Sequence, residues 1–224
     1  MLFPLGDVIV PRTTPVATWL LIALSVGVHL TLATGDPELR RATFLSWGLI
    51  PAAFSSGSVF TSMFVHGNLL HLAVNMICLW IFGDNVEDQL GHGRYLFFYL
   101  ACGAAAALAE TWASPDSLLP MVGASGAIAG VMGAYFVMFP RSRVLVLVFL
   151  VFFISVIEVP AVFVLAFWFF LQVIGRLGHA AEAASTGGVA LWAYAAGFAT
   201  GALGATLLRR PERAEWAWHD GRDA

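Results

Sequence analysis

The chain contains no lysine, so all 11 of its basic residues are arginines. Charged residues of any kind make up only 11% of the 224 residues, whereas hydrophobic residues make up 59%. A water-soluble domain of this length does not cover so much apolar surface, so the composition favours a single polytopic membrane domain. The absence of lysine also excludes a catalytic serine–lysine dyad.

Cysteine is almost as scarce. The two that are present, Cys78 and Cys102, fall within apolar stretches. We expect them to be small buried hydrophobic side chains, because their spacing matches no disulfide or metal-binding pattern. Prolines flank Arg12 in the segment 1–15, and no small-residue cleavage site follows a short apolar core there. This segment is therefore not predicted to be a signal peptide.

Six apolar runs approach the roughly 20 residues that a helix needs to cross a bilayer. They lie at 16–34, 60–82, 95–112, 121–139, 157–175 and 189–208. The predicted fold class is therefore all-α, with a six-transmembrane helix bundle at 1–208 and a tail at 209–224. The apolar run 144–157 is harder to place. Joined to the next span it would make a helix about 48 Å long, interrupted by Pro160. An interfacial segment and a buried irregular segment both remain open for it.

The arginines indicate the orientation. With six spans, 8 of the 11 arginines fall on the side that holds both termini: Arg12, Arg94, Arg141, Arg143, Arg209, Arg210, Arg213 and Arg222. The positive-inside rule then places both termini and the tail in the cytoplasm. A seventh span would move the four C-terminal arginines to the other side. We expect an integral multi-pass protein, and we expect its membrane to be a bacterial inner membrane.

In this topology three spans carry polar groups toward one pocket that opens to the exterior. Ser125 lies a few residues below the outer surface, and Tyr194 lies at a similar depth on the last span. His71 and Asn75 are four residues apart, so they share one helix face. An imidazole and an amide on one face can donate hydrogen bonds to a developing oxyanion. The alternative is that they only form hydrogen bonds between helices.

Small residues surround the serine. Gly123, Gly126 and Gly130 lie on both sides of Ser125, and Gly197 and Gly201 repeat the same four-residue spacing on the last span. Such stripes allow two membrane helices to approach closely. Helix packing alone would explain them, and only the polar set at the same depth favours a functional interpretation.

Four segments together resemble the rhomboid family of intramembrane serine proteases. They are 43-TFLSWGLIPAAFSSG-57, 62-SMFVHGNLLHLAVNMICLWIFGDNVED-88, 90-LGHGRYLFFYLACG-103 and 122-VGASGAIAGVMGAYFVMFP-140. The resemblance implies a six-helix bundle that cleaves membrane-anchored proteins at a water-filled cavity below the outer surface. It implies no metal, cofactor, nucleotide or nucleic acid. It implies that Ser125 is the nucleophile and that His71 and Asn75, with the Ser125 backbone N–H, form the oxyanion hole. His66 is expected to tie down the loop at the helix entrance.

One position departs from the family pattern. The family's general base is a histidine on the sixth helix, and the matching stretch here is 192-WAYAAGF-198. With the register fixed by Gly197 and Gly201, Tyr194 occupies the position of the base, and Ala196 replaces a second glycine. A neutral phenol, with a pKa of about 10, does not readily accept the serine proton. Loss of the base costs about 10⁶ in turnover in a soluble serine protease.

None of the other histidines lies on the last span, so none is an obvious substitute base. They are His29, His92, His179 and His219, and the resemblance assigns His71 to the oxyanion side. His92 and Arg94 are expected to form a solvated surface pair. The acidic run 84–88 is expected to be a solvated loop rather than a metal site.

Three functions remain open from the sequence. The first is an intramembrane serine endopeptidase with low or conditional activity on membrane-anchored substrates. The second is a pseudoprotease that binds transmembrane clients without cutting them. The third, a transporter or channel, is disfavoured because no span carries paired carboxylates at its centre and no helix broken by glycine or proline repeats between the halves.

Overall fold

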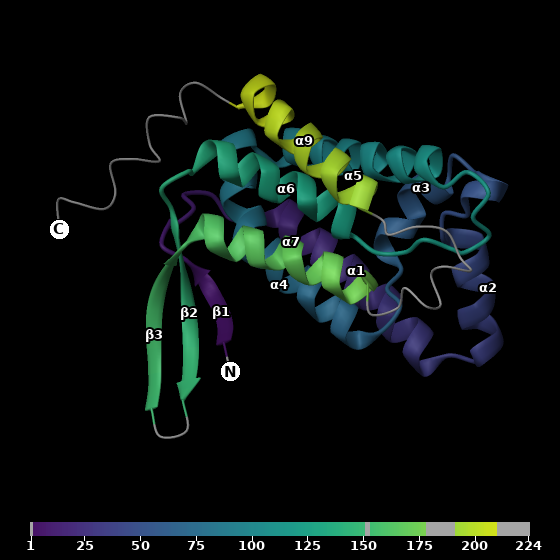
Figure 1. Cartoon of the computed structure of the whole chain (residues 1–224), viewed down its shortest axis with the longest axis horizontal. Coiled ribbons are helices and arrows are strands. Elements are labelled where there is room, and N and C mark those ends of the chain that lie inside the picture. Colours follow the sequence, from purple (N-terminus) through teal and green to yellow (C-terminus); the bar gives the residue numbers. More distant parts are fainter. Residues whose placement is uncertain (1, 151–152, 178–190, 210–224) are drawn as a thin grey trace.

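The computed structural model describes residues 2–150, 153–177 and 191–209 (Figure 1). His179, His219 and nearly all of the predicted tail lie outside these residues. The helices are α1 Val16–Thr34, α2 Pro37–Trp47, α3 Ser58–Thr61, α4 Leu69–Leu90, α5 His92–Ala113, α6 Ser125–Met138, α7 Ala161–Leu177 and α9 Leu191–Leu208. Two 3-10 turns are η1 Pro51–Ala53 and η2 Ser62–Phe64, and the strands are β1 Leu2–Asp7, β2 Arg143–Leu150 and β3 Phe153–Pro160.

The helices confirm a predominantly helical membrane protein. Among the described residues, α1, α4, α5 and α9 are long and apolar enough to cross a membrane, and α6 and α7 contribute shorter apolar helices. The predicted span 16–34 coincides with α1, whereas α4 continues eight residues beyond the predicted span, from 82 to Leu90.

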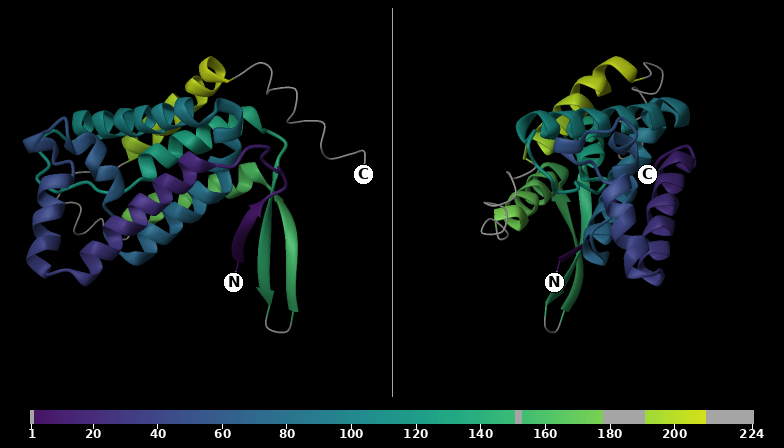
Figure 2. Two further views of the ribbon diagram at one scale, coloured as in Figure 1. Left: turned by 180° about the vertical axis from the view of Figure 1, so that it is seen from behind. Right: turned by 90° about the vertical axis from the view of Figure 1, so that its right-hand side faces the viewer.

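Helix α6 forms the centre of the bundle, where it packs against α4, α5 and α9 (Figures 1 and 2). Most of its residues are buried, including Ser125 at its start and Met138 at its end. Glycine and alanine at positions 126, 127, 129, 130, 133 and 134 let the neighbouring helices approach on several sides. At 14 residues α6 is about 21 Å long, so it is shorter than the bilayer core.

The run 144–157 adopts a structure that the sequence interpretation did not include. Strands β2 and β3 form an antiparallel hairpin, and β1 pairs with β2 to complete the order β1-β2-β3. Figure 2 shows the sheet extending from one end of the bundle. The run is rich in Val, Ile and Phe, which favour strands, and Val144 and Val146 pack into the core. Helix α7 accordingly begins at Ala161, after Pro160, and not at 157.

The acidic run 84–88 is the last part of α4, so the expectation of a solvated loop was wrong. Glu87 is fully buried, and its carboxylate accepts hydrogen bonds from the backbone N–H groups of Ala17 and Thr18 at 2.9 and 2.7 Å. It also accepts one from the Thr18 hydroxyl at 2.7 Å. Glu87 therefore accepts hydrogen bonds from N–H groups in the first turn of α1. These N–H groups have no partner within their own helix.

His92 is also placed differently from the expectation. Its Nδ1 lies 2.5 Å from a carboxylate oxygen of Glu87, so it belongs to the same polar cluster and does not form a solvated pair with Arg94. The backbone N–H of Thr13 adds a hydrogen bond to Asp88 at 3.0 Å. The end of α4 thus anchors the segment that leads into α1.

Asp7 links the sheet to the bundle. The Asn85 side-chain amide donates a hydrogen bond to Asp7 at 2.8 Å, and the Tyr135 hydroxyl donates a second, short one. Tyr135 also lies within 2.6 Å of the Ser142 hydroxyl. Burial raises the pKa of Asp7 to about 6, although the hydrogen bonds from Tyr135 and Asn85 act in the opposite direction. β1 is thereby attached to both α4 and α6.

Candidate active site

Ser125 is the first residue of α6, and its side chain is buried at 6% exposure. The four residues before it are not helical. Met121 exchanges two backbone hydrogen bonds with Leu49, at 2.9 and 2.8 Å, and the Gly123 N–H donates to the Ser62 carbonyl at 2.9 Å. These contacts fix the segment that leads into the helix. The first N–H groups of a helix have no partner within it, so backbone donors gather next to the Ser125 hydroxyl.

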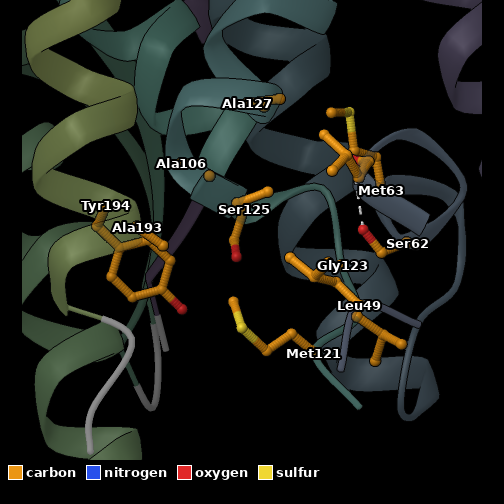
Figure 3. A pocket seen from close by; sticks show the side chains of 15 residues that line it. Leu49, Ser62, Met63, Ala106, Met121, Gly123, Ser125, Ala127, Ala193 and Tyr194 are labelled. Carbon is orange, nitrogen blue, oxygen red and sulfur yellow. Dashed lines mark hydrogen bonds between the residues drawn. The ribbon is translucent and has the colours of Figure 1, made fainter. Parts of the chain in front are cut away.

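Tyr194 lies near the start of α9 and is buried at 2% exposure. Ser125 and Tyr194 line the same cavity, whose volume is about 50 Å³. In Figure 3 both hydroxyl groups extend into this space, with Met121 beside them. The cavity is large enough for a few water molecules. Ser62, Met63, Gly123 and Ala193 complete much of its wall.

The two glycine stripes bring α6 and α9 together. A Cβ atom on Gly197 would lie 2.2 Å from the Gly126 carbonyl oxygen, and one on Gly201 would lie 1.8 Å from the Gly130 carbonyl oxygen. Neither position admits a side chain unless the backbone moves. Ala196 is half-buried beside this contact. This backbone-to-backbone approach determines how Tyr194 lies relative to Ser125.

Gly123 brings the loop before α6 against α4. Its φ of +120° is strained for residues with a side chain. A Cβ atom there would also lie 2.8 Å from the His71 Nε2 atom and 3.7 Å from the Asn75 side-chain nitrogen. His71 and Asn75 therefore both reach the loop that immediately precedes Ser125.

Asn75 has an unusual environment. It is fully buried, and neither its side-chain oxygen nor its side-chain nitrogen has a hydrogen-bond partner among the described residues. Buried amides are nearly always hydrogen-bonded, because an unpaired one carries its full desolvation cost. An amide held unpaired beside the serine loop can donate to a group that is not part of the resting protein.

The other histidines that the sequence analysis considered, where the structure describes them, do not line the serine cavity. His66 is buried at the entrance to α4, where its Nδ1 contacts the Phe64 carbonyl at 3.4 Å and its ring packs edge-on against His71 at 5.3 Å. His29 is buried in α1, and His92 binds Glu87. Across the described ranges, no histidine lines the cavity, and no group of three His, Cys, Asp or Glu side chains is placed to hold a metal.

The structure adds a residue that sequence reasoning missed. The Trp168 ring on α7 packs edge-on against the Tyr194 ring, with centroids 5.9 Å apart and an interplanar angle of 70°. Trp168 lies in an uninterrupted apolar run, so nothing in the sequence distinguished it from lipid-facing aromatic residues. Trp168 thus supports Tyr194 from α7 without lining the serine cavity itself.

A rhomboid domain model matches residues 55–211, which cover α4, α5, α6, α7 and α9. The chain is 34% identical to rhomboid protease GluP of Bacillus subtilis over 124 residues, 54% of this chain and 24% of that protein. It is 35% identical to mitochondrial rhomboid protein 1 of Saccharomyces cerevisiae over 96 residues, 41% of this chain and 28% of that protein. It is 29% identical to the putative rhomboid protease YdcA of Bacillus subtilis over 128 residues, 57% of this chain and 64% of that protein.

The match thus covers less than two thirds of each of these relatives. The rhomboid domain model, in contrast, includes Ser125, His71, Asn75 and Tyr194, because all four lie within residues 55–211. The apolar helices and this match identify an integral multi-pass membrane protein with the scaffold of an intramembrane protease. The chain belongs to the rhomboid family.

Proposed function

We propose that the chain is a rhomboid-type intramembrane serine endopeptidase scaffold for membrane-anchored proteins, and that its hydrolytic activity is impaired. The observation that carries this proposal is that Ser125 and Tyr194 line the same cavity. We propose that the Tyr194 phenol occupies the position of the family's general base. Family membership supports the protease scaffold. The impairment rests on the chemistry of the residues present.

The nucleophilic part of a protease site is intact. Ser125 presents its hydroxyl at the start of α6, where the backbone N–H groups of the first turn are available. Asn75 and His71 approach the same loop from α4. These groups would stabilise the negative oxygen of a tetrahedral intermediate, a contribution worth a factor of about 10² to 10³ for one donor.

The proton-accepting part is missing. Serine becomes a competent nucleophile only when an adjacent base takes its proton and later delivers it to the leaving amine. The Tyr194 phenol can hydrogen-bond with Ser125, but it does not hold an available basic lone pair near neutral pH. We therefore propose a turnover about 10⁶ below that of a site with an imidazole at this position.

The alternative is a rhomboid pseudoprotease that binds transmembrane clients without cleaving them. The buried Tyr194 ring and its edge-on contact with Trp168 favour this alternative, because they give the phenol a packed and well-defined place in the fold. A base position that had lost all purpose would not require such packing. Client recognition would then use the same membrane-facing helices as substrate recognition in a protease.

The proposal is tested in proteoliposomes with a fluorescent membrane-anchored substrate that carries a photo-crosslinker. We expect no Ser125-dependent cleavage by the wild-type chain, while crosslinking to the substrate is equal for wild type and Ser125→Ala. Cleavage that disappears in Ser125→Ala would overturn the impairment. Crosslinking without cleavage, even in Tyr194→His, would favour the pseudoprotease alternative.

We also propose that the chain lies in a bacterial inner membrane with both termini on the cytoplasmic side. When six spans are counted, 8 of the 11 arginines fall on that side. Reporter fusions at each end test this orientation. A reporter that is active only outside the cytoplasm should stay silent at both ends.

A further inference from the structure

A second cavity lies between α6, α7 and α9, and one of its lining residues is Trp168, whose ring packs against Tyr194 of the serine site. Its volume is about 510 Å³. Its walls are formed by Met132 and Phe136 of α6, Leu165 and Phe169 of α7, and Ala195 and Phe198 of α9, among others. We call this cavity the α7 groove. Figures 1 and 2 show that α7 runs along the outside of the bundle, so the groove lies on a membrane-facing side.

We propose that the α7 groove is a binding site for the acyl chain of a membrane lipid. Among the described residues that line it, Trp168 supplies the one N–H donor, and the other side chains are hydrocarbon except for the thioether of Met132. A polar ligand would therefore lose its hydrogen bonds on entering, whereas a hydrocarbon chain would lose none. The groove extends along α7 from Val162 to Phe169, which is about 10 Å of helix.

The size of the groove favours an acyl chain over a helix of another protein. The groove follows only about 10 Å of α7, which is about two helical turns. A spanning helix has more than five turns, so the groove would contact only a short part of it. A flexible hydrocarbon chain is thinner and can follow the irregular wall between Phe136 and Phe198.

We expect the groove to be occupied because an occupant restores packing contacts. The hydrophobic effect does not favour occupancy, because lipid tails are as apolar as the groove wall. An empty groove, however, leaves its wall atoms without dispersion partners on one side. Water is not a good filler, since it would find few hydrogen-bonding partners there. A lipid chain restores the lost contacts at little cost.

The occupied groove would also support the serine site. Trp168 lines the α7 groove and at the same time packs edge-on against Tyr194. Its ring is buried at 6% exposure, and its indole N–H has no hydrogen-bond partner among the described residues. An acyl chain in the groove would contact the Trp168 ring, which in turn packs against Tyr194.

The test uses two phenylalanines of α7 that differ in position. Phe169 lines the groove, whereas Phe167 does not line it and is 56% exposed. The photoreactive amino acid p-benzoylphenylalanine replaces each in turn in the full chain, reconstituted in phosphatidylcholine nanodiscs. Illumination followed by intact-mass spectrometry identifies what each position contacts. We expect a phosphatidylcholine adduct at both positions.

Variants that fill the groove distinguish an adduct with lipid bound in the groove from an adduct with bulk lipid. Ala195→Phe places a ring in the groove, and Ala199→Phe adds the same ring one turn further along α9 outside it. We expect Ala195→Phe to reduce the Phe169 adduct several-fold without changing the Phe167 adduct, and Ala199→Phe to change neither. Ala166→Leu fills the groove from α7 and should act like Ala195→Phe, so the test does not depend on one variant folding.

Three results would overturn the proposal. One is a Phe169 lipid adduct that persists unchanged in both filling variants. Another is a crosslink from Phe169 to another part of the chain instead of to lipid. The third is a crosslink to an added polyleucine transmembrane peptide in preference to phosphatidylcholine, which would assign the groove to a helix.

Discussion

A Cβ atom on Gly201 would lie 1.8 Å from the carbonyl oxygen of Gly130, so α6 and α9 touch through their backbones. We predict that Gly201→Ala lowers the unfolding free energy by about 2 to 3 kcal/mol, because a rigid backbone atom has to move to admit the methyl group. Gly27→Ala is the matched control. Gly27 is an exposed helical glycine with nothing within 4 Å of its Cβ position.

Denaturation in mixed micelles measures both variants. Gly27→Ala should be neutral or stabilising by about 0.5 to 1 kcal/mol, since alanine is the better helix former. Equal effects of the two substitutions would contradict the close approach of α6 and α9. That result would also remove the basis for placing Tyr194 next to Ser125.

Glu87 joins α4 to the first turn of α1, with its two oxygens within 2.9 Å of the Ala17 and Thr18 N–H groups. Glu87→Gln replaces one acceptor with a donor that faces other donors. We expect a loss of about 1 to 3 kcal/mol in the same unfolding assay. Glu38→Gln, at an exposed position of α2, should stay within about 0.5 kcal/mol. If Glu38→Gln is as costly as Glu87→Gln, the capping role of Glu87 is wrong.

Asp7, which links the sheet to the bundle, should make the stability of the protein depend on pH. Because the pKa of Asp7 is raised to about 6 in the folded chain, the folded protein binds a proton that the unfolded chain, with its ordinary value of 3.8, releases earlier. Stability should therefore fall as pH rises from about 4 to 6 and then level off, by up to about 3 kcal/mol from this group.

Asp7→Asn removes the titrating group and keeps a side chain of similar size. Thermal unfolding of wild type and Asp7→Asn, measured at pH 4.5 and 7 in the same detergent, gives the difference due to this carboxyl. The variant should lose part of the pH dependence. Identical pH dependence in both proteins would show that Asp7 does not titrate in this range.

For Asn75 we predict that a single substitution leaves stability equal or higher and lowers the reactivity of Ser125. Its amide is buried without a partner among the described residues, so Asn75→Leu should raise the unfolding free energy by about 1 kcal/mol or leave it unchanged. In a Tyr194→His background, the same substitution should slow acylation of Ser125 by about 10² to 10³. A large loss of stability in Asn75→Leu would instead mean that Asn75 serves as a packing residue.

The sequence predicted the helical membrane fold because long apolar runs identify transmembrane helices directly. The hairpin at Arg143–Pro160 escaped prediction because nearly every residue in it is apolar. A strand buried or apolar on both faces shows no alternation, and its pattern cannot be distinguished from part of a helix. The pairing of β1 with β2 joins residues about 140 positions apart, and no local signal reveals such a contact.

The serine and tyrosine were predicted to face one pocket because they lie at a similar depth on two spans, with the register of the last span taken from Gly197 and Gly201. The polar cluster around Glu87 was missed for a different reason. Acidic residues in a run normally face water, and only the arrival of the α1 N-terminus, which needs acceptors, makes their burial favourable. Trp168 and Asp7 were missed likewise, since their importance depends on partners from distant segments.

The central claim is that Ser125 fails to react only because position 194 holds a tyrosine and not a base. A fluorophosphonate probe in detergent-solubilised protein measures this directly, with Ser125→Ala as the blank. We predict no Ser125-dependent labelling of the wild-type chain and clear labelling of Tyr194→His that disappears when Ser125→Ala is added. Wild-type labelling at Ser125, equal to that of Tyr194→His, would contradict the account.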